Sequence, residues 1–167
     1  MRLIEPLLME FDREASTTRK VLERCPDAKL SWQPHPKSMT LGKLAHHVAT
    51  IPAWIGSSLL ADGLDLATAP PMPPVPETVA GIVKEFEASC AAAKGAMAQL
   101  DDAKAMGIWT FSRAGATLLS MPRIALLRTI LLNHSFHHRG QLSVYLRLLD
   151  VPVPSIYGPS ADEIPLG

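Results

Sequence analysis

Six histidines are the residues of this chain best suited to chemistry, and five of them fall in two short clusters. His46 and His47 lie in the segment LAHHVA, and His134, His137 and His138 lie in the segment NHSFHHRGQ. Two histidines at positions i and i+4 share one face of a helix, so His134 and His138 could hold one ion between them. A third imidazole from a facing helix would complete a three-nitrogen site with an open position, which is typical of a catalytic metal.

Helical periodicity leaves two ligand sets open in the second cluster. The buried side of the last helix is expected to carry Leu127, Ile130, Leu131, Gln141, Tyr145 and Leu149. His134 falls near the middle of that arc, His138 inside it and His137 at its edge, so the pair of His134 and His137 remains a competitor. In the first cluster, His47 lies beside an apolar stripe, whereas His46 points away from it and is expected to meet solvent.

A single inward histidine is more often a hydrogen-bonded core residue than a metal ligand. Three inward histidines from two helices change that balance. Without an organising centre they would leave several buried nitrogens unpaired, at about 1–3 kcal/mol each. The pattern therefore indicates a site for one divalent metal ion, with a set of paired core histidines as the alternative.

Other polar residues could support such a site. Glu14 falls on the inward arc of the first helix and is the one acid considered as a catalytic base, although most glutamates are exposed. His35, in a loop between two prolines, and Tyr157, in the C-terminal tail, could reach the mouth of the site. Gln141 is expected to orient a ligand histidine, and Arg139 is expected to pair with a carboxylate rather than contact substrate.

Four long helical segments, with little strand signal, must position these residues. The apolar spacing predicts helices over roughly residues 3–23, 41–59, 77–100 and 122–149. Thr40 is expected to cap the second helix, and Pro52 is expected to kink or break it. Residues 69–76 are proline-rich and predict an extended linker, while residues 108–111 could form a short strand or a packed loop.

The chain of 167 residues is expected to form a single domain, residues 1–167. Four helices with a long second connection predict an all-α fold, a four-helix bundle with a crossover connection.

Sixteen basic and sixteen acidic side chains balance, which argues against a nucleic-acid binder. No run is long enough to span a bilayer and the start is unlike a signal peptide, so we expect no membrane association. Cys25 and Cys90 are expected to be reduced, which predicts a cytoplasmic location.

Two segments of the sequence resemble the DinB/YfiT-like superfamily. They are WQPHPKSMTLGKLAHH, residues 32–47, and HSFHHRGQ, residues 134–141, and the tail segment PSIYGP adds to the likeness. The resemblance covers nearly the whole chain and implies a four-helix bundle with a crossover, often a homodimer. It also implies a metal site made of one histidine from the second helix and two from the fourth, here His47, His134 and His138. It thereby favours His138 over His137, with zinc as the expected ion and nickel as a common occupant.

Three neutral imidazoles would leave the charge of the ion uncompensated, so its open position would favour an anion. Because relatives of this kind include thiol-dependent S-transferases and a mycothiol-dependent isomerase, the expected function is transfer of a low-molecular-weight thiol to a small-molecule electrophile. The first alternative is a metal-dependent hydrolase that uses metal-bound hydroxide. The second is a metal-binding stress-response protein without turnover, because the family includes many members induced by stress or DNA damage.

Overall fold

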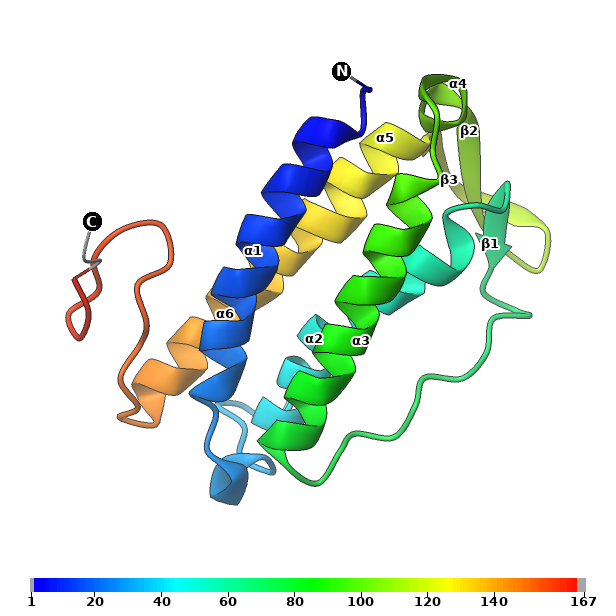
Figure 1. Ribbon diagram of the computed structural model, residues 1–167. Helices are drawn as coiled ribbons and strands as arrows, with labels where there is room; N and C mark the ends of the chain where they lie inside the picture. The colour runs from blue at the N-terminus through cyan, green and yellow to red at the C-terminus, as the bar shows by residue number, and fades with distance from the viewer. Residues whose placement is uncertain (1, 165–167) are drawn as a thin grey trace.

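Four long helical segments form the body of the protein in a computed structural model that describes residues 2–164 (Figure 1). They are α1 (Glu5–Glu23), α2 (Leu41–Ser58), α3 (Val79–Ala98) and a continuous last segment made of α5 (Arg123–Leu126), η2 (Leu127–Asn133) and α6 (His134–Leu148). Two short helices, η1 (Asp27–Lys29) and α4 (Asp102–Met106), lie in the connections. The predicted helical bundle is therefore confirmed.

The path of the chain through the bundle includes the expected crossover. In Figure 1, α2 and α3 lie side by side and run in the same direction, opposite to α1 and α6. Two neighbouring helices that run the same way need a connection that returns along their whole length. Residues 59–78 make this connection, and its proline-rich part, residues 69–76, has no regular secondary structure, as the linker prediction required.

The second helix begins as predicted but is not broken at Pro52. The Thr40 hydroxyl accepts a hydrogen bond from the backbone N–H of Lys43 at 3.3 Å, which satisfies one of the unpaired donors of the first turn. The helix then runs through Pro52 to Ser58 without interruption. A proline removes only one backbone donor, and burial on several sides of α2 outweighs that loss. The close neighbour is α3, because a Cβ on Gly56 would lie 2.9 Å from the backbone of Ala92.

A small sheet, which the sequence predicted only in part, closes one end of α2. Its strands are β1 (Gly63–Asp65), β2 (Ile108–Arg113) and β3 (Ala116–Pro122), in the order β1-β2-β3. The sheet pairs β1 parallel to β2 and β2 antiparallel to β3. Trp109 of β2 is fully buried, and its indole N–H donates to the backbone oxygen of Ser58 at 3.1 Å. The strand alternative for residues 108–111 is thus the correct one.

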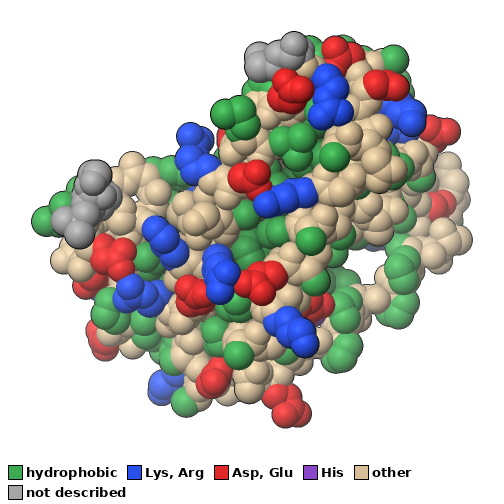
Figure 2. All heavy atoms as spheres, in the orientation of Figure 1, with side chains coloured by type: hydrophobic (Ala, Val, Ile, Leu, Met, Phe, Trp, Pro, Cys, Tyr) green, Lys and Arg blue, Asp and Glu red, His purple; other side chains and the backbone are tan. Residues whose placement is uncertain are grey.

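The surface in Figure 2 carries acidic and basic side chains interspersed, in keeping with the balanced charge of the chain. The same view shows an open notch between the extended connection and the rest of the molecule. None of the helices within residues 2–164 combines the length and the apolar character needed to cross a membrane.

Candidate metal centre

The last helical segment contains a wide turn directly before the second histidine cluster. Residues Leu127–Asn133 are π-helical, and the backbone N–H of His134 donates to the carbonyl of Thr129, five residues earlier. Each π-turn shifts the faces of the helix that follows, and such turns are frequent at functional sites. Here the shift buries Leu142 and Leu146 on α6 and leaves Gln141 exposed. Of the arc predicted for a straight helix, Gln141 is therefore wrong, whereas Tyr145 and Leu149 are partly buried and pack against the core.

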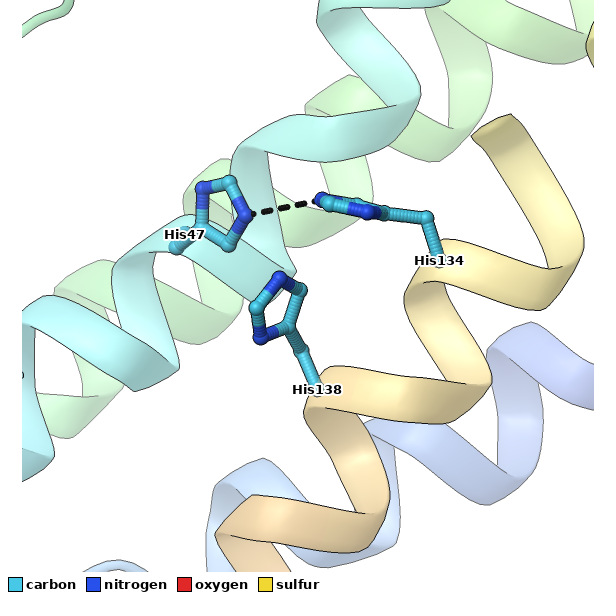
Figure 3. A group of neighbouring side chains, drawn as sticks. All are labelled: His47, His134 and His138. Atoms are coloured by element: carbon cyan, nitrogen blue, oxygen red, sulfur yellow. Dashed lines mark hydrogen bonds between the residues drawn. The ribbon is translucent and has the colours of Figure 1, made fainter. Parts of the chain in front are cut away.

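Three histidines from two helices converge on one point (Figure 3). His47 comes from α2, and His134 and His138 come from the first two turns of α6. The Nε2 atoms of His47 and His134 are 3.1 Å apart, and each of the three rings offers one nitrogen within 4.8 Å of the others. Tetrahedral zinc with nitrogen ligands at about 2.0–2.1 Å would hold two such nitrogens roughly 3.3 Å apart. The three residues therefore fit a divalent ion.

Gln141 fixes the orientation of one ring of the three-histidine group. Its side-chain oxygen lies 2.8 Å from Nδ1 of His138, so Nδ1 carries the hydrogen and donates it. The other ring nitrogen, Nε2, is then the one with a free lone pair. Gln141 thus makes the contact that was expected of it, although its side chain is more exposed than predicted.

The surroundings keep all three imidazoles neutral. Burial lowers the pKa of His47 to about 4, and the neighbouring His138, His134 and His46 add to the effect. Burial also lowers the pKa of His134 and of His138, where the Gln141 contact partly opposes it. A neutral imidazole is the form that binds a metal, so protons compete weakly for these ligands at neutral pH.

The metal-free protein is expected to lose stability as the pH falls from 6.5 towards 4. An ordinary histidine has a pKa of 6.5, whereas that of His47 is about 4 in the folded protein. Between these values the unfolded chain binds a proton that the folded protein excludes, so the stability contributed by neutral His47 is complete above pH 6.5 and declines below it. Because water screens this partly exposed ring, the total loss is at most about 2–3 kcal/mol. Urea unfolding with a chelator at a series of pH values measures this slope. The His47→Gln variant should show a shallower slope, and identical slopes would contradict the assignment.

The two remaining clustered histidines lie outside the group. His137 is exposed, although its ring stacks edge-on with that of His138 at 4.8 Å between centroids. The structure therefore brings His138, and not His137, to His47. The expectation that His46 meets solvent is wrong, because α3 covers that side of α2. His46 is 2% exposed, and its Nε2 lies 3.0 Å from a carboxylate oxygen of Glu85 on α3.

The other predicted residues occupy different places. Glu14 is buried, but its carboxylate pairs with Arg139 at 2.7 Å and accepts a hydrogen bond from Tyr157 at 2.8 Å. Arg139 thus pairs with a carboxylate as expected, and the Tyr157 hydroxyl forms hydrogen bonds with both members of the pair. His35 is exposed, and its Nδ1 accepts from the backbone N–H of Lys37 at 3.1 Å within its own loop. Neither Glu14 nor His35 belongs to the three-histidine group.

A pocket of about 520 Å³ opens beside the histidines. His47 and His134 form part of its wall, and the rest is mainly apolar, with Trp54, Phe111 and the linker residues 70–73. Sequence reasoning missed these wall residues, although one signal was present. Trp54 follows His47 by seven residues, which is two helical turns, so both side chains lie on the same face of α2.

Comparisons with known proteins identify relatives of this chain and agree with its fold. The sequence pattern of the DinB family matches residues 3–165. The uncharacterized protein YrdA of Bacillus subtilis (strain 168) is 30% identical over 163 residues, which cover 96% of this chain and 91% of YrdA. The crystal structure of a DinB-like protein from Bacillus cereus ATCC 10987 superposes with a TM-score of 0.71 at 28% identity, over 92% of this chain and 97% of that one. The DinB-like protein YjoA from Bacillus subtilis shares the fold, with a TM-score of 0.71 at 16% identity over 91% of this chain and 97% of that one.

Proposed function

The chain belongs to the DinB family, and from that premise we propose that it is a metal-dependent enzyme that joins a small thiol to a small electrophile. The observation that carries the proposal is the convergence of three neutral imidazoles beside an apolar pocket, with His47 and His134 in the pocket wall. A divalent ion such as zinc, when bound, would lower the pKa of a thiol at its open position. His47, His134 and His138 would hold the ion.

The two cysteines of the protein are poorly suited to act as the sulfur nucleophile, which favours a separate thiol molecule. Cys25 and Cys90 are both buried, and burial raises the pKa of each thiol to about 12. The thiolate is the reactive form of a thiol, so neither residue is a nucleophile at neutral pH. Neither side chain lines the pocket. The thiol in the proposed reaction is therefore a cosubstrate.

The neighbouring residues have supporting tasks. Gln141 keeps the Nε2 atom of His138 turned towards the other two rings. The apolar walls beside Trp54 and Phe111 exclude water and hold the apolar part of the electrophile. Hydrolysis is the less supported alternative, since the acid considered for it, Glu14, already pairs with Arg139 and Tyr157.

A spectroscopic test uses protein loaded with cobalt(II) and 2-mercaptoethanol as the thiol. We expect a new sulfur-to-cobalt charge-transfer absorption, which 2-methoxyethanol should not produce. With 1-chloro-2,4-dinitrobenzene as the electrophile, we expect a sulfur–carbon bond to form while chloride leaves and the thiol proton passes to solvent, in a reaction that a chelator stops. His137→Ala is the matched control and should behave as the wild type. Chelator-sensitive turnover of 4-nitrophenyl acetate without any response to thiol would support hydrolysis instead.

A further inference from the structure

The pocket beside the three histidines has walls suited to an organic ligand. Its volume, about 520 Å³, lies within the range of about 300–1,000 Å³ found for small-molecule sites. Trp54 and Phe111 meet edge to face in its wall, with ring centroids 5.5 Å apart. Both rings are only partly buried and so are accessible from the pocket. Such walls favour a ligand with an apolar body of aromatic size.

One carboxylate interrupts these apolar walls. Glu85 of α3 is the acidic residue that lines the pocket, and its side chain is 27% exposed. One of its oxygens lies 3.0 Å from Nε2 of His46, which has no aligned hydrogen bond despite being buried. Within residues 2–164, no hydrogen bond of good geometry reaches the carboxylate of Glu85, whose nearest basic group is the ring of His46. Its carboxylate therefore lies beside His46 and keeps acceptor capacity unused at the wall of the pocket.

We propose that this pocket binds a small molecule that carries both an apolar body and an ammonium group, and that Glu85 pairs with the ammonium group. The inference rests on the proposed function, since the reacting end of the ligand would face His47 and His134 across the same pocket. A carboxylate in apolar surroundings is costly unless a cation accompanies it. Aromatic faces such as those of Trp54 and Phe111 also attract ammonium groups. An anionic ligand would instead meet the like charge of Glu85.

Glu85 acts in this proposal by recognition and not by proton transfer. It selects a ligand by charge, whereas the apolar walls select it by size. The proposal also places the apolar body of the ligand next to Ala53, which lines the pocket. A larger side chain at this position would fill the space that the ligand needs.

The test measures binding of two matched probes to metal-free protein by titration calorimetry. The probes are 2-(2-naphthyl)ethylamine, which is cationic, and 2-naphthylacetate, which is anionic. We expect the amine to bind at least about tenfold more tightly than the acid, because a hydrogen bond to a charged group is worth about that factor. In Glu85→Gln this preference should disappear. Glu87→Gln, on the exposed side of the same helix, should retain it.

A second pair of variants tests where the probe binds. Ala53→Phe should abolish binding of the amine, whereas Ala88→Phe, at an exposed position of α3, should leave it unchanged. Equal affinity for the two probes, or an amine preference that survives Glu85→Gln, would overturn the proposal. Because these measurements use metal-free protein, their failure is separate from failure of the metal centre. Metal content and the cobalt spectrum of the same variants, measured after separate loading with the metal, decide that question.

Discussion

Replacing His134 with alanine is expected to abolish stoichiometric metal binding. His134 lies close to both other rings, with its Nε2 3.1 Å from that of His47 and its ring centroid 4.4 Å from that of His138. Loss of a residue that merely orients a ligand already lowers metal affinity about 10–100-fold, so loss of a ligand should cost more than about 100-fold. Elemental analysis after loading with zinc and dialysis should find about one ion per wild-type chain and almost none in His134→Ala.

The neighbouring His137→Ala variant is the matched control for this experiment. It removes an imidazole from the same turn of α6 but not from the three-histidine group. It should retain full metal content. A chelator should lower the unfolding temperature of the wild type and of His137→Ala, since an ion that binds only the folded state stabilises it. Full metal content in His134→Ala would show that the ion binds elsewhere, and the proposed centre would fail.

The sequence was sufficient for the bundle because its helices carry strong local signals. The apolar residues of α2 recur at helical spacing, and the Thr40 cap and the linker before α3 mark its ends. The helices that carry the two histidine clusters could also be anticipated from this spacing. The short strands β1 and β3 could not be, because three to seven residues give little periodicity and their pairing depends on partners far along the chain.

The details of the histidine site depended on features without a local signal. The π-turn before His134 changes the face that α6 presents, and no residue type announces such a turn. It explains why Gln141 is exposed and yet reaches His138. The burial of His46 has a similar origin. Periodicity identifies one apolar stripe on α2, but α3 packs so closely on another side that this side is buried as well.

The pocket itself is a product of tertiary structure. Its walls come from α2, the linker, α3, β2 and the last helical segment, which lie far apart in the sequence. Glu85 is one of the two acidic residues of α3, and nothing in its sequence context separates it from the other, Glu87. Only the packing of α3 on α2 places one of these carboxylates against His46 and leaves the other at the surface.

Glu14→Ala is expected to destabilise the protein by about 3–5 kcal/mol, since it leaves a buried charge without its partner. Arg139 is only 1% exposed, and its strongest contact is the carboxylate of Glu14 at 2.7 Å. Its guanidinium also donates hydrogen bonds to the side chains of Thr18 and Tyr157 and to the backbone carbonyl of Glu14, all of which are neutral groups. Urea unfolding at neutral pH gives the free energy of unfolding for the variant and the wild type.

The matched control lies one turn earlier on the same helix. Glu10 forms a two-armed ion pair with Arg128, at 2.6 and 2.7 Å, but there the arginine side chain is 43% exposed. Water screens such a pair, so Glu10→Ala should cost no more than about 1 kcal/mol. A loss in Glu14→Ala no larger than in Glu10→Ala would contradict the structural role of the buried pair. The double variant Glu14→Leu/Arg139→Met should recover much of the stability, because it removes both charges together.

This buried pair also bears on the metal centre through the chain itself. Arg139 follows His138 directly, and the two side chains leave α6 in different directions, one to α1 and the other to α2. The ion pair therefore holds α6 at the point from which His138 reaches the other histidines. If Glu14 acts only by holding α6 in position, the turnover of Glu14→Gln per folded, metal-loaded molecule should equal that of the wild type. A catalytic base at Glu14 would instead lose turnover in protein that is still folded and still holds its metal.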